Sequence, residues 1–340
     1  MKSKMHFILF LVFVAGILQS NAQDLHFSQY FNAPILVNPA NTGFNPDNDY
    51  RIGANYRNQW GAVGTPFKTM SVWGDAQLFT GRFENGWMGV GGALYRDAAG
   101  SGNLLNTSAY ASVAYHQMLG YSSLLSIGFT GGFISKRIDI AKLSFDNQWN
   151  GQFFDATIPS NEPFAFSQTS YADLQAGINY AYFASDKLYI NAGLSAQHIN
   201  RPRESFFDPL VSDASIDMRY TAFLNASVKI GESWIVNPNV YMSKMNTASE
   251  LVLGVNANRD LSGDGSRQMI LGLYMRNGDA VIPVFGFQLN DTRFTFNYDA
   301  TVSTLKAANN TRGAYELSII KTGVVSSALA RGVRCPSVKF

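Results

Sequence analysis

Charged residues are scarce in this chain. Lys, Arg, Asp and Glu make up 15% of its 340 residues, against roughly 25% in a typical soluble domain. The single cysteine, Cys335, excludes an internal disulfide and a cysteine-rich metal site. Beyond residue 22 there is no apolar run long enough for a membrane-spanning helix. The lack of such an apolar run argues against a helical membrane protein.

Aromatic and small residues are correspondingly abundant. The chain has 25 Phe, 16 Tyr and 30 Gly, yet its mean hydropathy is only -0.05. Few charges, many aromatics and a neutral average are typical of a β-sheet wall that is apolar on one face and polar on the other.

Residues 1–22 have the pattern of a cleaved signal peptide. Lys2 and Lys4 give a basic start, and an apolar run follows that is too short to span a bilayer as a helix. Small residues precede Gln23, the expected mature N-terminus; a retained anchor is the alternative. The mature chain would carry 24 basic and 24 acidic residues, and no basic patch favours nucleic-acid binding.

A two-residue period begins after residues 23–49, which form an irregular Asn- and Pro-rich lead-in. Ile52 and Tyr56 then fall on one face, and Arg51 and Arg57 on the other. Because successive side chains of a strand point to opposite faces, this segment has one apolar face and one polar face. Similar segments recur at 69–78, 87–95, 107–117, 124–134, 171–183, 188–198, 219–230, 234–243, 250–258, 269–276, 281–289, 293–299 and 314–321.

The number and length of these segments indicate an all-β fold, a transmembrane outer-membrane antiparallel β-barrel of about 14 strands. Pro238 and Pro283 fall inside two segments. Proline lacks the N–H that a ladder needs, so we expect those strands to be bulged or shortened.

The connections between the segments alternate in length. The long links include 96–106, 135–170 and 199–218, whereas the links between them are short. Short periplasmic turns alternating with longer outside loops are typical of outer-membrane barrels. We therefore expect the outer membrane of a Gram-negative bacterium, with both termini periplasmic. The link 259–268 breaks the pattern, because it is longer than the link that follows it.

Aromatic residues lie near the predicted strand ends and indicate interfacial girdles, although ordinary β-formers would give the same composition. The residues concerned are Tyr50, Trp60, Trp87, Tyr95, Tyr180, Tyr182, Phe183 and Trp234.

Motifs for catalysis or metal binding are missing. His26, His116 and His198 are isolated, and His198 continues the outward face of its strand. The segment 260–266 is faintly similar to a calcium loop, but its Gly and Asp residues favour a simple turn, since Leu271 replaces the closing Glu. We expect no enzyme, no cofactor and no metal site.

Charged residues of both signs occupy the polar phase of the strands. A selective pore often concentrates one sign, so mixed signs favour a lumen cross-linked by ion pairs or filled by a plug. A water-filled channel with incidental charges is the alternative. Candidate fillings are the lead-in and the loop 135–170. The candidate lumen charges are Arg51, Arg57, Asp75, Asp173, Arg219, Lys229, Glu250, Arg276, Arg293, Asp299 and Glu316.

The barrel is expected to end near residue 321, which leaves 322–340 as a C-terminal extension. Its last residues include Arg334, Cys335, Pro336 and Phe340. A partner-docking or lumen-inserted tail is one interpretation, and a frayed terminus is the other. Cys335 would face an oxidising compartment, where it could bond to another protein or remain a buried thiol.

Short motifs spread along the mature chain resemble the PorP/SprF family of the type IX secretion and gliding apparatus of Bacteroidetes. They are Gln23-Asp-Leu-His-Phe-Ser-Gln-Tyr-Phe31, Val37-Asn-Pro-Ala-Asn-Thr-Gly43, Tyr56-Arg-Asn-Gln-Trp60, Gly272-Leu-Tyr-Met-Arg276, Asp279-Ala-Val-Ile-Pro-Val-Phe-Gly-Phe-Gln288, Tyr298-Asp-Ala-Thr-Val-Ser303, Gly313-Ala-Tyr-Glu-Leu-Ser318 and Arg334-Cys-Pro336.

The resemblance implies a non-enzymatic outer-membrane component of type IX protein secretion. Such a protein would assist secretion or surface attachment of a large adhesin, or form part of the secretion machine. Its partners would be a secreted adhesin or other cargo, periplasmic secretion components, and outer-membrane lipid. The alternative is a small-solute porin or a transporter similar to fatty-acid channels. Two extra residues before the final aromatic depart from the family's Cys-Pro ending.

Overall fold

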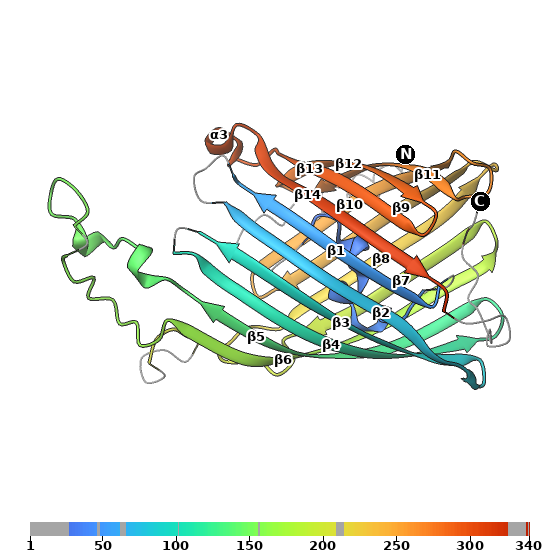
Figure 1. Ribbon diagram of the computed structural model, residues 1–340, viewed down its shortest axis with the longest axis horizontal. Coiled ribbons are helices and arrows are strands. Elements are labelled where there is room, and N and C mark those ends of the chain that lie inside the picture. The colour runs from blue at the N-terminus through green and yellow to red at the C-terminus, as the bar shows by residue number, and fades with distance from the viewer. Residues whose placement is uncertain are drawn as a thin grey trace, which may run out of the picture.

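The computed structural model describes residues 27–45, 48–61, 66–100, 102–155, 157–208, 214–325, 338 and 340. In this part of the chain, fourteen antiparallel strands close into one barrel, and β1 pairs with β14 (Figure 1). The predicted barrel is thereby confirmed. The strands are β1 (Tyr50–Gln59), β2 (Phe67–Phe83), β3 (Gly86–Ala99), β4 (Leu104–Leu119), β5 (Ser123–Arg137), β6 (Gln168–Ser185), β7 (Leu188–Gln197), β8 (Arg219–Ile230), β9 (Trp234–Met245), β10 (Ala248–Asp260), β11 (Arg267–Arg276), β12 (Ala280–Leu289), β13 (Thr292–Thr301) and β14 (Arg312–Gly323).

Several strands are longer than their periodic segments. β2 has 17 residues and β6 has 18, whereas the alternation predicts 69–78 and 171–183. Alternation marks only the stretch that separates an apolar from a polar environment. Beyond that stretch the strand continues without a hydropathy pattern, and in β2 its pairing with β3 is irregular between Leu78 and Phe83.

The two strand prolines leave the strands unbroken. Pro238 lies within β9 and Pro283 within β12, and neither strand is shortened. On the β13 side, pairing stops after Val281 and resumes at Val284 in the same register. On the β11 side Pro283 keeps its partner Leu273. The predicted bulge or shortening is therefore wrong, because the proline interrupts the ladder along one edge only.

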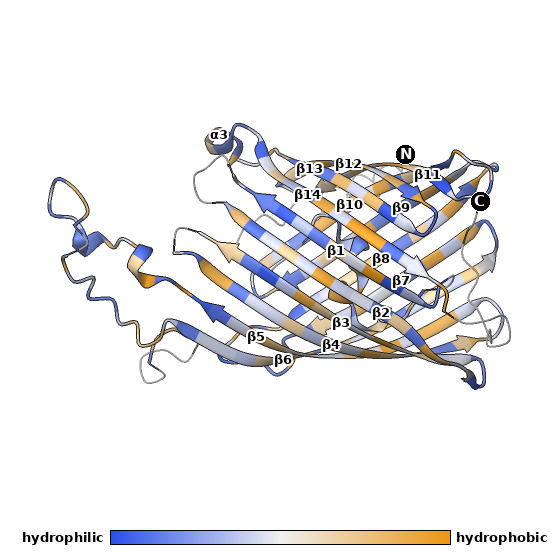
Figure 2. Cartoon of the chain, in the orientation of Figure 1, coloured by the Kyte–Doolittle hydropathy of each residue, from blue (hydrophilic) through white to orange (hydrophobic). Residues whose placement is uncertain are grey.

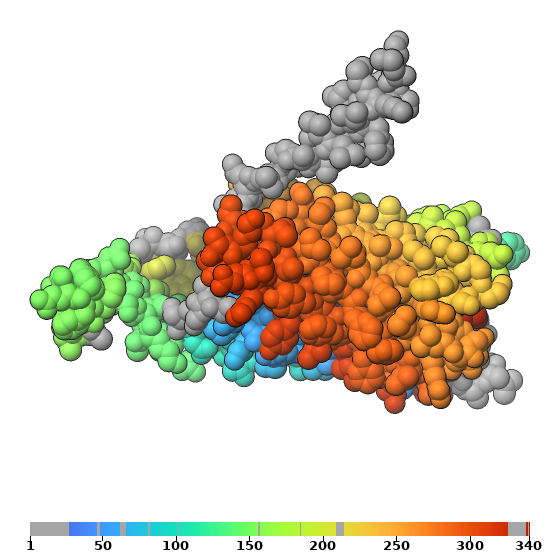
Figure 3. Space-filling view, turned by 90° about the horizontal axis from the view of Figure 1, so that it is seen from above, coloured from blue at the N-terminus to red at the C-terminus, as the bar shows by residue number. Residues whose placement is uncertain are grey.

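The outside of the barrel is apolar. Ile52, Val72 and Leu94 are 55%, 56% and 63% exposed, as expected for side chains that face lipid. Apolar and polar residues alternate along the strands in Figure 2, and Figure 3 shows the continuous outer surface over the last strands. No helix within the described residues is both long and apolar enough to span a membrane.

The two ends of the barrel differ. One, the turn end, holds the start of β1, the end of β14 and the turns 84–85, 120–122 and 186–187. The other, the loop end, carries the longer connections. The largest of these, between β5 and β6, projects away from the barrel (Figure 1). This loop does not fill the lumen, contrary to one of the two predicted fillings, because its path leads outward from the strand ends.

Residues 27–45, here called the plug, lie inside the barrel (Figure 1). They form three single-turn helices, η1 (Tyr30–Asn32), α2 (Pro34–Val37) and η2 (Pro39–Asn41). The plug begins near the loop-end half of β1 and β14, and it ends at the turn end before β1. The first 26 residues, which include the predicted signal peptide, lie outside the described residues.

Candidate functional site

The predicted lumen charges all occupy inward-facing positions of their strands. Eight are buried, and Arg51, Lys229 and Arg293 are half-buried. Arg51 pairs with Asp75, and Lys229 pairs with the exposed Glu232. Arg51 therefore has a carboxylate partner, but Arg51 and Arg293 also line a cavity at the turn end.

Five of these residues form one cluster toward the loop end, here called the ion cluster. Arg57 Nη2 lies 3.0 Å from Asp299 Oδ2, and Arg57 Nη1 lies 3.3 Å from Glu316 Oε2. Arg276 contacts Asp299 at 3.2 Å and Glu250 at 3.1 Å. All five side chains are buried. Three carboxylates thus meet two guanidinium groups, which leaves acceptor capacity for further donors.

The beginning of the plug supplies those donors. The Ser28 and Gln29 amides donate to the two carboxylate oxygens of Glu316 at 2.9 and 3.1 Å. The Ser28 hydroxyl donates to Asp299 at 2.7 Å, and the Gln29 side-chain amide donates to Asn297 at 2.6 Å. Buried backbone N–H groups need partners, and a carboxylate is a strong acceptor. The ion cluster therefore anchors the plug.

The middle of the plug is held by backbone groups of the opposite wall. The Asn38 side-chain amide donates to the carbonyls of Ile178 in β6 and Leu194 in β7, at 3.0 and 3.2 Å. It sits against Gly177 and Gly193, where any Cβ would clash with Asn38. These inward glycines make room for the asparagine.

The same part of the plug touches β5 at Gly128. A Cβ at Gly128 would lie 2.3 Å from the Pro39 carbonyl carbon and 2.5 Å from the Ala40 nitrogen. Both are backbone atoms that cannot rotate away. Only glycine allows the plug backbone to approach the wall this closely.

The end of the plug is fixed by polar side chains of β2, β3 and β4. Asp75 accepts from the Gly43 amide at 2.7 Å, and the Trp87 indole donates to the Gly43 carbonyl at 3.1 Å. His116 donates from Nε2 to the Thr42 carbonyl at 2.8 Å. The isolated histidine of the sequence is thus a fully buried contact to the plug.

Some outward-facing assignments are wrong. His198 is buried with Nδ1 2.8 Å from Asp173 Oδ1, because its positive φ of 56° ends the alternation of β7. Trp87, Tyr95 and Phe183 are buried, whereas an interfacial girdle would expose them. Strand-end position alone does not separate aromatics that face lipid from those that face the plug.

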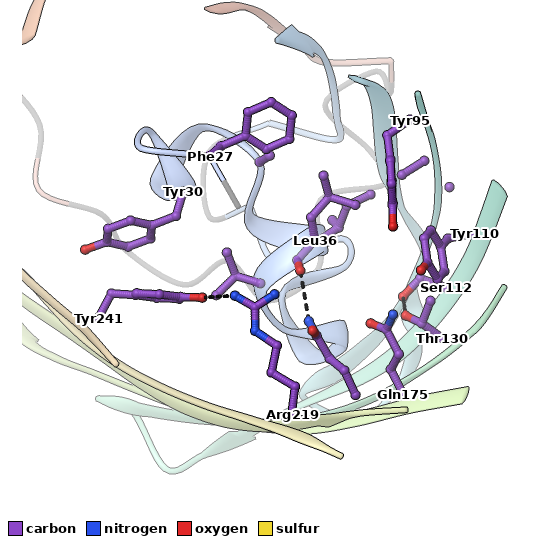
Figure 4. A pocket seen from close by; sticks show the side chains of 16 residues that line it. Phe27, Tyr30, Leu36, Tyr95, Tyr110, Ser112, Thr130, Gln175, Arg219 and Tyr241 are labelled. Atoms are coloured by element: carbon purple, nitrogen blue, oxygen red, sulfur yellow. Dashed lines mark hydrogen bonds between the residues drawn. The ribbon is translucent and has the colours of Figure 1, made fainter. Parts of the chain in front are cut away.

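A small cavity lies between the plug and the wall toward the loop end. A cavity of about 70 Å³ lies between Leu36 of the plug and the wall residues Tyr110, Arg219 and Tyr241 (Figure 4). Arg219 donates to the Tyr241 hydroxyl at 2.9 Å. A space of this size holds only a few water molecules.

The turn formed by residues 260–266 satisfies its own carboxylates. Asp260 accepts from the amides of Ser262 and Gly265, and Asp264 accepts from the Ser266 amide. Hydrogen bonds from the Ser262 hydroxyl first, and then from Ser266, hold the pKa of Asp264 below its usual range. Across the described ranges no three His, Cys, Asp or Glu side chains are grouped to hold a metal.

The C-terminal candidates are only partly described. Arg334, Cys335 and Pro336 lie outside the described residues. Phe340 lines a cavity at the turn end.

Loss of an arginine from the ion cluster should lower the free energy of unfolding more than loss of an arginine from an exposed ion pair. Arg57→Met leaves Asp299 and Glu316 with less positive charge, so we expect a loss of about 3–5 kcal/mol. The control is Arg201→Met, whose partner Asp217 lies 2.8 Å away in an exposed pair; its loss should stay under about 1 kcal/mol. Urea unfolding of the refolded barrels, followed by tryptophan fluorescence, measures both. Equal losses would contradict a structural role for the cluster.

Comparison with known proteins found similar solved structures and one matching family. Among solved structures, the chain is similar to the Ralstonia pickettii toluene transporter TbuX, with a TM-score of 0.48 and 10% identity over 86% of this chain and 94% of that chain. It is also similar to a Pseudomonas aeruginosa FadL homologue, with a TM-score of 0.49 and 9% identity over 91% of this chain and 96% of that chain. For the translocator domain of the Neisseria meningitidis autotransporter NalP, the TM-score is 0.40 and the identity is 11% over 80% of this chain and 88% of that chain. No curated protein matches the chain.

The family comparison is more specific. The family described as type IX secretion system membrane protein PorP/SprF matches residues 19–320. This range includes the plug and nearly all of the barrel, and such a membrane family together with a closed β-barrel fits the outer membrane. The chain belongs to the PorP/SprF family of type IX secretion system membrane proteins.

Proposed function

We propose that this barrel is a non-enzymatic component of type IX secretion that holds proteins rather than passing solutes. It would assist the secretion or surface attachment of a large adhesin, or form part of the machine. A secreted cargo protein, periplasmic secretion components or both would be its partners. The observation that carries the proposal is the plug, which the wall holds at its start, middle and end.

The short sequence motifs support this proposal because they meet at the plug. Ser28 and Gln29 belong to the first motif and dock on the ion cluster. Four other motifs supply the wall residues of that cluster, namely Arg57, Arg276, Asp299 and Glu316. A barrel selected as a conduit would not need its most distinctive segments to fix an obstruction in the lumen.

The projecting loop between β5 and β6 offers a surface for a protein partner. Trp149, Phe153 and Phe154 are about half exposed on it, beyond the strands that lipid would cover (Figure 1). Exposed aromatic groups outside a membrane are typical of protein interaction sites. We infer that the loop end faces outward and the turn end faces the periplasm, as in other barrels with short periplasmic turns.

Deletion of this chain from its host tests the proposal. We expect a large secreted protein to disappear from the cell surface, while the abundance of unrelated outer-membrane proteins stays constant. Surface proteomics of intact cells after protease shaving measures both. Re-expression of the full chain should restore the surface protein. An unchanged surface profile, combined with loss of growth on one small solute, would favour a transporter instead.

A further inference from the structure

The turn end of the barrel contains a chamber of about 770 Å³ between the plug and the wall from β8 to β14. Eleven of its lining side chains are Asn or Gln, among them Asn225, Asn256 and Gln268. Carboxamides provide both donors and acceptors without net charge. Such a lining matches the alternating N–H and C=O groups of an extended polypeptide, which has no strand partner inside a lumen.

We propose that this turn-end chamber is a binding site for the chain's own C-terminal segment, which ends at Phe340. Val338 and Phe340 both line the chamber. The Cβ of Phe340 lies 3.4 Å from the position that a Cβ on Gly265 would take. The last residue therefore lies beside the β10–β11 turn.

Unpaired acceptors lie beside Val338. Val338 also lines a second cavity of about 280 Å³, together with Asn191 and Asn225. The side-chain oxygens of these two asparagines are buried and have no hydrogen-bond partner among the described residues. A buried unpaired acceptor is costly, so each oxygen favours an N–H donor from an incoming peptide.

The geometry of the chain permits this docking. Val325 follows β14 at the turn end, where its amide donates to Asp49 at 2.8 Å. The interval from Val325 to Val338 can span up to about 45 Å when extended.

A disulfide in the full-length chain tests the site. With Cys335→Ser as background, Gly265→Cys and Phe340→Cys should form a bond under mild oxidation, because their Cβ atoms fit disulfide geometry. The control pairs Phe340→Cys with Gly278→Cys, a turn glycine at the loop end. Gly265 and Gly278 have similar φ values of 77° and 73°, so backbone strain is matched.

Mobility of the denatured protein on a non-reducing gel reports the bond. We expect a reducible shift in most of the Gly265→Cys protein and little in the control. No shift in either pair, or the same shift in both, would overturn the proposal.

A peptide experiment tests the site without engineered cysteines. A barrel ending at residue 325 keeps all fourteen strands and should bind a fluorescent peptide of residues 326–340 carrying Cys335→Ser. Asn225→Leu should weaken binding about fivefold, the equivalent of roughly one hydrogen bond. A peptide that stops at residue 336 should not bind. Equal anisotropy changes with both peptides would contradict the docking of Phe340.

Discussion

Removal of residues 27–45 should open the lumen of the barrel to the passage of ions. The plug crosses the lumen and is hydrogen-bonded to opposite walls, to β14 at its start and to β6 and β7 at its middle. A lumen of this strand number is wider than its own side chains can fill. We expect single-channel conductance in planar bilayers to rise roughly tenfold or more above that of the intact chain.

The matched control removes a segment of similar length that lies outside the lumen. Replacing residues 145–165 of the projecting loop with a short Gly-Ser linker leaves the plug untouched. Its conductance should equal that of the intact protein. High conductance in the intact chain, or none after plug deletion, would contradict a lumen closed by residues 27–45.

Gly128→Val should loosen the plug while leaving the barrel closed. The new Cβ would fall 2.3 Å from the Pro39 carbonyl carbon, so the plug backbone has to move. Overpacking of this kind costs about 1–3 kcal/mol. Because the strands are not obstructed, we expect the cost to fall on the plug and to raise its amide exchange about 5- to 150-fold.

The same strand provides the control. Gly131 of β5 faces outward, and nothing lies within 4 Å of a Cβ placed there, so Gly131→Val changes β-propensity without touching the plug. Hydrogen–deuterium exchange of peptides from residues 27–45 should be fast only in Gly128→Val. Equal exchange in both variants would show that the Gly128 contact does not hold the plug.

The barrel follows from the sequence because lipid and lumen impose opposite demands on alternate residues. Ile52 and Arg51 are neighbours on opposite faces, and that contrast repeats along every strand. The inward direction of the charges could be predicted for the same reason. Their partners could not, since Arg57 meets Glu316 across 259 positions of sequence.

The contacts of the plug could not be predicted from the sequence either, because their partners also lie far apart along the chain. Asn38 is one of many asparagines in an aperiodic segment, and its acceptors in β6 and β7 lie 140 and 156 positions away. One local pattern does point to them. Gly128, Gly177 and Gly193 occupy inward positions where polar side chains would be expected, and glycines in strands indicate close approach of other groups: the plug backbone at Gly128 and the Asn38 side chain at Gly177 and Gly193.

Purification of the full-length chain from its native outer membrane shows whether the barrel holds proteins or passes solutes. The eluate would be analysed by mass spectrometry, and the same preparation would be reconstituted for conductance. We expect near-stoichiometric recovery of a large secreted protein or of periplasmic secretion components, with little passage of small solutes. Recovery of the barrel alone, together with steady solute conductance, would contradict this expectation.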